Sequence, residues 1–418
     1  MSCSCCESGG DTGDGPEHGC EIRPLLELTP IAVGGRVSQP ALIGELQVFL
    51  DDQPASAETW HRLGVALNAE GRYAEAAAAL HSALTLSPQS LGVECDFAFA
   101  LSGIGEFQQA GAMLEEVIHR DPGNGWAYFH LAAARFRQNA CAEAAMLWEC
   151  AAKCLDDPAD CLENLAMAYR RLGDGDQERG CWRRLAAIDP GNVAVAHMLS
   201  AVGAAPLRAR ASDEYVVQLF DRFAADFDSV LGVLDYAVPE ISETWMRSEF
   251  PEPNGSLCIL DAGCGTGLCG ERLAPWADRL VGVDLSAEML ERARRRGVYD
   301  EIVEDELVSF LLARPGAFDV IVAGDVLCYF GDLKPFGEAA LAALRPGGRL
   351  AFSVEAAGSD EPADVGYLLR GHGRYSHTRA HVRSAFEFAA SLAMSETVLR
   401  LEASVPVDGL WVEADRGD

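Results

Sequence analysis

Lysine is scarce in this sequence: only Lys153 and Lys334 occur among 418 residues, and 33 basic residues stand against 64 acidic ones. Clustered basic side chains bind phosphate backbones and anionic membranes, so the net charge of −31 argues against both partners. No apolar run approaches the roughly 20 residues that a membrane span needs. The first residues also lack the basic and apolar segments of a secretory signal, and we therefore expect a cytoplasmic protein.

Fourteen cysteines are present, and in a reducing cytoplasm we expect thiols instead of disulfides. Residues 1–40 are predicted to form a flexible, acidic, cysteine-rich tail. Its candidate ligands for a soft metal such as zinc or copper(I) are Cys3, Cys5, Cys6, His18 and Cys20. Because the adjacent Cys5 and Cys6 depart from the usual spacing of zinc ligands, we predict no metal site and keep this cluster as the alternative.

Prolines and glycines recur at a fixed interval in the N-terminal half. Pro54, Pro88 and Pro122 are 34 residues apart, and Gly71 and Gly105 repeat that interval. The clearest unit contains Trp60, Leu63, Gly64, Gly71, Tyr73, Ala76, Leu80, Ala83 and Pro88. This pattern resembles the tetratricopeptide repeat, in which two helices pack through small residues. We therefore predict an α-solenoid over residues 41–205.

Four full repeats are predicted after a half repeat at 41–56. They cover residues 57–90, 91–124, 125–158 and 159–192. The third departs most from the pattern, since Asn139 stands at the turn glycine and Asp156 at the proline. In the concave groove of the solenoid the resemblance places Cys95, Phe99, Trp126, Phe129 and Phe136. If exposed, these residues indicate a peptide or protein partner; burial against neighbouring helices is the alternative.

The pattern changes after the link at 203–212. An amphipathic helix is predicted from Asp213 to Phe227. Strands are then predicted at 257–261, 280–284, 301–303, 318–323 and 349–354, with helices near 267–275, 286–296, 304–313 and 333–344. This alternation predicts a parallel sheet covered by helices over residues 206–418. The fold class is therefore a solenoid followed by a Rossmann-like α/β domain, and the poorly apolar link suggests that the two are separable.

A glycine-rich segment follows the first predicted strand: Asp261-Ala-Gly263-Cys264-Gly265-Thr-Gly267-Leu268. Glycines allow a tight turn and the close approach of a ligand. Position 268 is Leu where the dinucleotide pattern requires Gly, which disfavours a nicotinamide-dependent oxidoreductase, the alternative enzyme class. The second strand ends at Asp284, where a carboxylate can accept both hydroxyls of a ribose.

With Glu304-Asp305-Glu306 after the third strand and Asp325 after the fourth, these motifs resemble those of class I S-adenosylmethionine-dependent methyltransferases over about residues 206–415. The resemblance implies S-adenosylmethionine as cofactor. The residues it assigns to cofactor binding are Tyr215, Asp261, Gly263, Cys264, Gly265, Gly267, Asp284, Leu285, Met289, Asp305, Glu306 and Asp325. Several of these keep a structural alternative: Tyr215 and Met289 as core residues on helices, Asp305 or Glu306 as a solvated helix cap, and Cys264 as a residue that makes only loop contacts.

Further segments are similar to bacterial methyltransferases that carry N-terminal tetratricopeptide repeats. They are Ala196-His-Met-Leu199, Asp213-Glu-Tyr215-Val, Asp325-Val-Leu-Cys-Tyr329-Phe and Gly373-Arg374-Tyr375-Ser-His377. The substrates of that family are largely undefined, so this resemblance implies the architecture and the cofactor and leaves the methyl acceptor open.

The candidates on the acceptor side are Tyr329, Arg374, Tyr375 and His377, and for each of them a purely structural role is the alternative. An arginine beside aromatic and imidazole groups suits a carboxylate or another anionic group. The segment after the fourth strand is not Asn-Pro-Pro-Tyr, which argues against methylation of amide or adenine nitrogens. We therefore expect a small anionic molecule or a peptide as acceptor, recruited by the repeats. The alternative is an interaction protein whose methyltransferase domain only binds the cofactor.

Overall fold

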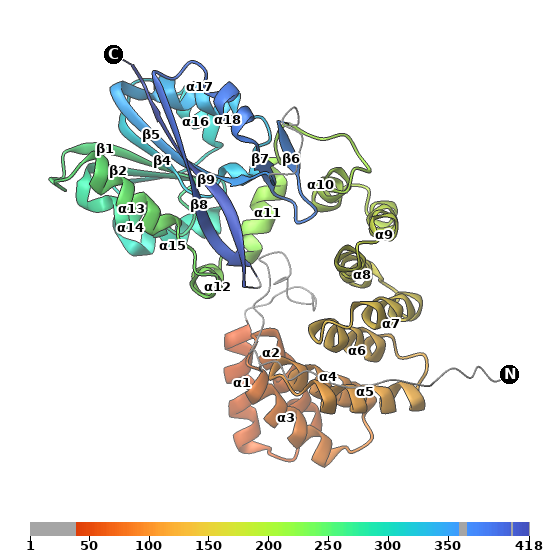
Figure 1. Cartoon of the computed structure of the whole chain (residues 1–418). Coiled ribbons are helices and arrows are strands. Elements are labelled where there is room, and N and C mark those ends of the chain that lie inside the picture. The colour runs from red at the N-terminus through yellow and green to blue at the C-terminus, as the bar shows by residue number, and fades with distance from the viewer. Residues whose placement is uncertain (1–38, 359–365, 403, 418) are drawn as a thin grey trace, which may run out of the picture.

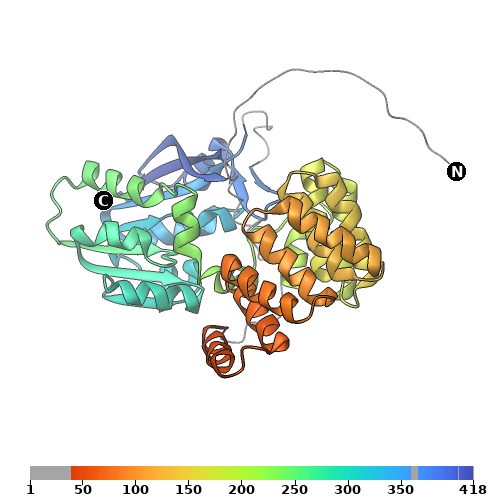
Figure 2. The ribbon, with the colours of Figure 1, turned by 90° about the horizontal axis from the view of Figure 1, so that it is seen from below.

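The computed structural model describes residues 39–358, 366–402 and 404–417. Helices α1 to α10 form an arch, and the residues that follow form an α/β region beside the end of that arch (Figure 1). Figure 2 shows the two regions side by side from below, with the first helices of the arch nearest the viewer. None of the helices in these residues is both long and apolar enough to cross a membrane.

Each predicted repeat is a pair of consecutive helices, which confirms the helical repeat region. The pairs are α2 (Ala57–Ala69) with α3 (Tyr73–Leu86), α4 (Leu91–Gly103) with α5 (Phe107–Arg120), α6 (Gly125–Arg137) with α7 (Cys141–Cys154), and α8 (Ala159–Leu172) with α9 (Gly175–Ile188). Helix α1 (Gln39–Asp52) precedes them and α10 (Val193–Ala201) follows. The buried apolar residues form three clusters along the arch, each shared by helices of neighbouring units, so that no single pair forms its core alone.

The turn inside each repeat requires a positive φ. Gly71, Gly105 and Gly173 have φ of 72°, 90° and 73°, and Asn139 holds the same place in the third repeat with φ 62°. Asparagine tolerates this left-handed conformation better than other side chains do. The third repeat therefore keeps the turn despite its departure from the sequence pattern.

The groove residues predicted as a partner surface are mostly buried. Cys95, Phe99, Phe129 and Phe136 all lie in the core, whereas Trp126 is 44% exposed. Phe136 contacts a tryptophan of the next helix with ring centroids 5.4 Å apart. The alternative of packing against neighbouring helices therefore holds for four of the five, and these residues form no exposed aromatic stripe.

The α/β region is built on a mostly parallel sheet, which confirms the predicted fold class. Its central strands are β1 (Leu257–Ala262), β2 (Ala277–Asp284), β3 (Glu301–Glu304), β4 (Phe318–Ala323) and β5 (Leu344–Ala356). They are ordered β3–β2–β1–β4–β5. Because the order reverses between β1 and β4, the carboxyl ends of these two strands frame the crevice in which such sheets bind ligands.

Helices cover both faces of this sheet. The helices are α11 (Asp213–Phe223), α12 (Phe227–Val233), α13 (Val238–Glu249), α14 (Leu268–Leu273), α15 (Ala287–Arg296), α16 (Leu307–Leu312), α17 (Lys334–Ala343) and α18 (Arg379–Ala385). Successive strand residues point to opposite faces. Accordingly Ile259 packs in a core with residues of α13 and α14, and Leu260 packs in another with residues of α16, α17 and α18.

Four strands that the sequence analysis did not predict extend the sheet. They are β6 (Tyr367–Leu369), β7 (Tyr375–His377), β8 (Ser391–Glu402) and β9 (Val405–Asp415). Strand β9 runs antiparallel to β5 and pairs with β8, while β7 lies beside the end of β5 and pairs with β6. These strands place Arg374, just before β7, and Arg400, on β8, in one buried cluster.

Helix α10, which follows the last repeat, docks on the α/β region. His197 of α10 stacks on Tyr215 of α11, with ring centroids 4.1 Å apart, and its Nε2–H donates to the carbonyl of Gly373 at 2.8 Å. The link also joins this region, because the Gly331 N–H donates to the Ala209 carbonyl at 2.8 Å. The domain boundary between 205 and 206 and the separability of the two regions stay predictions, and the link is hydrogen-bonded to the α/β region.

Candidate active site

A cavity lies at the carboxyl ends of β1, β2 and β4, where the strand order reverses. Helices α11 and α12, which we call the lid, contribute one wall, and loops that follow the strands contribute the others. The sequence-predicted residues that line it are Asp261, Gly263, Cys264, Gly265, Asp284, Leu285, Asp305, Glu306, Asp325, Tyr329 and Arg374. Residues separated by up to 113 positions in the sequence are therefore brought to one cavity.

The glycine loop turns through backbone conformations that other residues rarely adopt. Gly263, Gly265 and Gly267 have φ of 72°, 53° and 93°. A Cβ on Gly263 would lie 2.4 Å from the side chain of Val326, whereas one on Gly265 would meet nothing within 4 Å. Gly265 therefore leaves open space for a ligand. Gly267 instead faces Tyr299 and starts α14, so its role is structural.

Asp284 stands at the end of β2 and is held by backbone groups. Its Oδ2 accepts the N–H of Gly265 at 2.9 Å, and its Oδ1 accepts the N–H of Ser286 at 3.0 Å. Burial raises the pKa of this carboxyl, although these bonds oppose the shift. Each carboxylate oxygen keeps a further lone pair, so the two hydroxyls of a ribose can donate to it.

Asp305 and Glu306 follow β3. Glu306 caps α16, because its carboxylate accepts the N–H groups of Val308 at 3.1 Å and Ser309 at 2.9 Å. Burial would raise the pKa of Glu306, but these bonds prevail and the pKa is lowered. The helix-cap alternative thus describes Glu306, and Asp305, which also lines the cavity, is the better candidate for contact with an adenine amine.

Asp261 is the most deeply buried carboxyl of the cavity wall, at 1% exposure. Burial raises its pKa to about 7; the Tyr299 hydroxyl, which donates to Oδ2 at 2.6 Å, opposes the shift, and the nearby Asp284 adds to it. A positive charge nearby stabilises the ionised form of a buried carboxyl, which is otherwise costly to ionise in the free protein. This position suits the ammonium group of a bound amino-acid moiety.

Asp261→Asn is expected to stabilise the cofactor-free protein at pH 8 by on the order of 1–4 kcal/mol. Because the pKa of Asp261 is higher in the folded than in the unfolded chain, its stability contribution is complete below about pH 4 and is lost as the pH rises through about 7. Urea unfolding at pH 5 and pH 8 measures this. An Asp278→Asn control, on an exposed part of β2, should show no such pH dependence; a pH-independent difference for Asp261→Asn would contradict the assignment.

Two carboxylates fasten the lid to the loops of the sheet. Asp221 of α11 accepts the hydroxyl of Ser286 at 2.6 Å. Asp228 of α12 accepts the hydroxyl of Thr266, which lies in the glycine loop, at 2.5 Å and also pairs with Arg296. The lid is therefore tied to both loops that flank the expected cofactor position.

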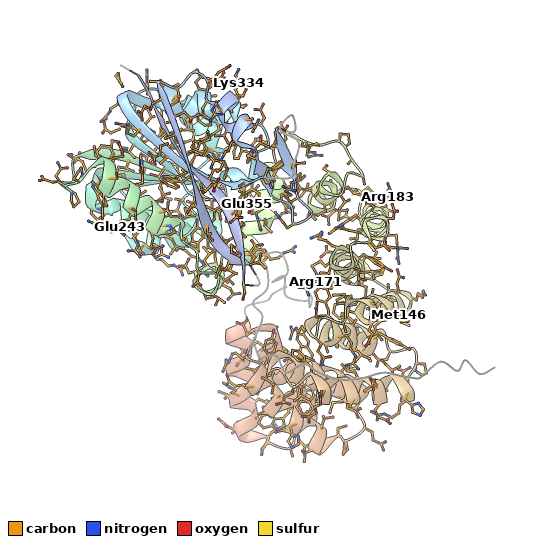
Figure 3. The ribbon with its side chains drawn as sticks, in the orientation of Figure 1. Met146, Arg171, Arg183, Glu243, Lys334 and Glu355 are labelled. Carbon is orange, nitrogen blue, oxygen red and sulfur yellow. The ribbon has the colours of Figure 1, made fainter. Side chains whose placement is uncertain are left out.

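A buried charge cluster lies beside the cavity, and its members Asp325, Arg374 and Arg400 line the cavity wall. Arg400 binds Asp325 Oδ2 and Glu402 Oε1, each at 2.8 Å, and also Glu355. Arg374 binds Glu355 at 2.6 Å and Glu402 at 2.5 Å. Figure 3 shows Glu355 inside the α/β region. We call these five residues the floor cluster; two guanidiniums there face three carboxylates.

These ion pairs correct the expectation that Arg374 binds an anionic acceptor. Its guanidinium already binds Glu355 and Glu402, and the side chain is nearly buried. The neighbouring His372 contributes no charge at neutral pH, because burial, reinforced by Arg374, lowers its pKa to about 4. An anionic acceptor would have to compete with two buried carboxylates for Arg374, so the arginine is a structural counterion.

Four other predicted residues do not line the cavity. Tyr215 turns toward His197, and Met289 is fully buried on α15. The Tyr375 hydroxyl donates to a carbonyl of the link at 3.0 Å, and His377 packs in the protein interior. The amphipathic pattern of α11 predicts an apolar face, but it does not predict whether a residue on that face meets the cavity or the junction with α10. The alternation of side chains along β7 likewise does not predict which of its two faces meets the cavity. These four are packing residues.

Sequence reasoning missed three residues of the site. Arg400 lies on a strand that was not predicted, Tyr236 lies in the loop between α12 and α13, and Tyr299 follows α15. A lone tyrosine or arginine outside a motif gives no local signal. Only the pairing of β8 with β9 brings Arg400 to the cavity.

The cysteine cluster of the tail lies outside the described residues. Among the residues that the structure describes, no group of three His, Cys, Asp or Glu side chains is arranged to hold a metal ion. Cys264, in the glycine loop, is buried, and burial raises its pKa well above the usual value, which gives an unreactive thiol.

The fold and the cavity together define a class. An open glycine loop after β1, a buried carboxyl beside it and Asp284 at the end of β2 offer partners for the three parts of S-adenosylmethionine: backbone space for the methionine moiety, Asp261 for its ammonium and Asp284 for the ribose. The C-terminal region is a class I S-adenosylmethionine-dependent methyltransferase domain.

Comparison with known proteins agrees with this class. Residues 260–352 match the family model described as "Methyltransferase domain", and residues 42–160 match the "Cytochrome c-type biogenesis protein H TPR domain". The predicted combination of repeats with a methyltransferase domain is thus confirmed, as is the predicted cofactor. Among curated relatives, human "Methyltransferase-like protein 27" is 36% identical over 108 residues, which are 25% of this chain and 44% of that protein.

Several further relatives are each named "Ubiquinone biosynthesis O-methyltransferase". The protein from Xylella fastidiosa (strain 9a5c) is 35% identical over 100 residues, which are 23% of this chain and 41% of that protein. The protein from Methylocella silvestris is 29% identical over 177 residues, which are 38% of this chain and 67% of that protein. The chain thus spans less than half the length of the human and Xylella relatives.

Solved structures also resemble parts of the chain. An S-adenosylmethionine-dependent methyltransferase from Mesorhizobium loti is 25% identical, covers 42% of this chain and 98% of its own, and has a TM-score of 0.33. The 1,6-didemethyltoxoflavin-N1-methyltransferase of Burkholderia thailandensis is 21% identical, covers 51% and 93%, and has a TM-score of 0.38.

Proposed function

We propose that this chain transfers a methyl group from S-adenosylmethionine to a hydroxyl of a small molecule. The observation that carries the proposal is the meeting, in one cavity under the lid, of the glycine loop, Asp284 and Asp325 with the apolar side chains of the lid. The relatives named as O-methyltransferases support oxygen as the acceptor atom, because the segment that they share with this chain belongs to the methyltransferase domain.

The chain's own residues bind the cofactor, orient the acceptor and exclude water. When bound, S-adenosylmethionine supplies an already activated methyl group, so the protein has chiefly to hold the acceptor oxygen in line with it. Gly265 leaves room beside the loop, and Asp284 accepts hydrogen bonds from the ribose. The lid, fastened through Asp221 and Asp228, keeps water from the reacting atoms.

The walls of the cavity favour a small molecule over a peptide. Phe220, Phe223 and Phe227 of the lid region face the cavity together with Tyr329. Phe220 packs edge-on against Tyr329, with centroids 5.4 Å apart. A lid that is fastened at both of its helices leaves a space suited to a compact apolar molecule.

Turnover tests this function. The purified full-length protein is incubated with methyl-labelled S-adenosylmethionine and a metabolite extract of bacterial cells. We expect a labelled small-molecule product and an equal amount of S-adenosylhomocysteine. No S-adenosylhomocysteine above the level of the protein-free control would contradict the function and favour a protein that only binds the cofactor.

We further propose that the repeat region positions the acceptor side of the site. His197 contacts two segments that border the cavity. It stacks on Tyr215 of α11, a helix whose other face lines the cavity, and it bonds to Gly373, which precedes Arg374 of the floor cluster. A Cβ on Gly373 would lie 2.8 Å from the Tyr215 hydroxyl, so the three residues are closely packed. Recruitment of a protein partner by the repeats, with Trp126 exposed, remains a second proposed role.

His197→Ala is expected to destabilise the folded chain by about 1–3 kcal/mol, because it removes a buried hydrogen bond and a ring stack. It should also lower turnover of the acceptor while S-adenosylhomocysteine affinity stays within about threefold. Thermal unfolding and calorimetry measure these effects. His119→Ala, an exposed histidine of α5, is the control; a His197→Ala protein with wild-type melting temperature and turnover would refute the positioning role.

A further inference from the structure

The floor cluster carries one carboxylate more than it carries guanidiniums. Arg374 and Arg400 face Asp325, Glu355 and Glu402, and all five are largely buried. Buried charges are stable when each is paired and hydrogen-bonded. A surplus carboxylate at a cavity wall is therefore stabilised by a ligand that brings a hydrogen-bond donor or a positive charge.

Asp325 is the member of the cluster with unused acceptor capacity. Its Oδ2 binds Arg400 at 2.8 Å, but its Oδ1 is buried and has no hydrogen-bond partner among the described residues. The side chain is 16% exposed and lines the cavity. A buried carboxylate oxygen without a donor is costly, which makes such an atom informative about the ligand.

The backbone holds Asp325 in place. The residue follows β4 with φ 54°, a conformation that is uncommon for a side chain other than glycine, and its N–H donates to the Ser353 hydroxyl at 2.8 Å. Residues held in such conformations cluster at functional sites. The strained conformation and the bond to Arg400 fix the carboxylate at the end of β4, beside the expected position of the transferred methyl group.

The rest of the lining offers nothing for an anion. The basic residues among the described lining residues are Arg210, Arg374 and Arg400, and each is paired with carboxylates; Arg210 binds Asp213 at 2.8 Å and Glu306 at 3.2 Å. Among the other lining side chains that interact with Asp325 are Tyr236, Cys269 and Cys328, and none of these three carries a positive charge. An acceptor that carries a carboxylate or phosphate would meet excess negative charge without a free cation.

We propose that the methyl acceptor is a molecule without an anionic group, and that its hydroxyl donates a hydrogen bond to Asp325 Oδ1, which takes the hydroxyl proton during transfer. This inference rests on the proposed function and names its substrate class. In the balanced step, the acceptor oxygen forms the new O–C bond, the S–C bond of the cofactor breaks with its electron pair on sulfur, and the proton moves to Asp325. Burial raises the pKa of Asp325, against the opposing effect of Arg400, which favours proton uptake.

The charge of the product is the first test. Labelled products from the extract experiment are separated on an anion-exchange column at pH 8. We expect the labelled product, distinguished from unreacted S-adenosylmethionine by its mass, in the unretained fraction, since a neutral or cationic acceptor gives such a product. Label retained by the column would overturn the inference and leave the proposed function standing, whereas the absence of any labelled product would overturn both.

Asp325→Asn is the second test, because it replaces the proton acceptor with an amide of the same shape. We expect product formation to fall about 100-fold or more, with S-adenosylhomocysteine affinity within about threefold of wild type. The melting temperature is measured on the same sample, and a folded, cofactor-binding but inactive variant supports the role. Glu396→Gln, which removes an exposed carboxylate from β8, should keep full activity. An Asp325→Asn protein that retains more than about a third of wild-type activity would overturn the role.

Discussion

Arg400→Met lowers the free energy of unfolding by about 3–5 kcal/mol, because removing one partner from a buried charge network leaves the others uncompensated. Arg400 is 1% exposed and binds Asp325, Glu355 and Glu402. Without it, three carboxylates would share the single guanidinium of Arg374. The corresponding fall in melting temperature is about 6–20 °C for a domain of this size. Urea and thermal unfolding at pH 7 measure the effect.

Arg379→Met is the matched control for this change. Arg379 also pairs with a glutamate of β8, Glu396, but both side chains are substantially exposed. An exposed pair of this kind contributes about 0–1 kcal/mol. Similar losses for the two variants would show that the floor cluster is not the buried network described above.

Asp284→Ala is expected to weaken S-adenosylmethionine binding by about 10–150-fold, which corresponds to about 1.5–3 kcal/mol for hydrogen bonds to a charged group. The carboxylate accepts from the glycine loop at Gly265 and offers its remaining lone pairs to the ribose. The variant therefore loses ligand contacts and one anchor of the loop together. Isothermal titration calorimetry with S-adenosylmethionine measures the loss.

Two further variants separate these contributions. Asp284→Asn keeps one acceptor oxygen for the loop and should bind more tightly than Asp284→Ala. Asp278→Ala removes an exposed carboxylate from the other end of the same strand and should leave affinity unchanged. If Asp284→Ala retained wild-type affinity, Asp284 would not contact the ribose.

The parts of the site that sequence reasoning could predict are those encoded by local pattern. The glycine loop and Asp284 belong to a strand, a turn and a second strand, and their spacing alone places them at one edge of a parallel sheet. The repeats can likewise be predicted from the sequence, because a 34-residue interval indicates a helix pair at each occurrence. Asn139 shows that the pattern even tolerates substitution where the side chain suits the turn.

The parts that it could not predict depend on contacts between distant segments. Asp325 and Arg400 are 75 positions apart, and only the pairing of β5, β9 and β8 brings them together. Arg374 looked like a free cation because its partners, Glu355 and Glu402, lie on two different strands. Tyr215 was assigned to the cofactor because an amphipathic helix does not reveal which of two partners its apolar face meets.

Equilibrium dialysis of the full-length protein against labelled S-adenosylmethionine tests the central claim most directly. The account predicts one binding site per chain, displaced by S-adenosylhomocysteine and not by NADH. The assignment of the cavity to this cofactor would be contradicted if no labelled S-adenosylmethionine bound, even at protein concentrations well above those used to test Asp284→Ala. It would also be contradicted if NADH displaced the bound label.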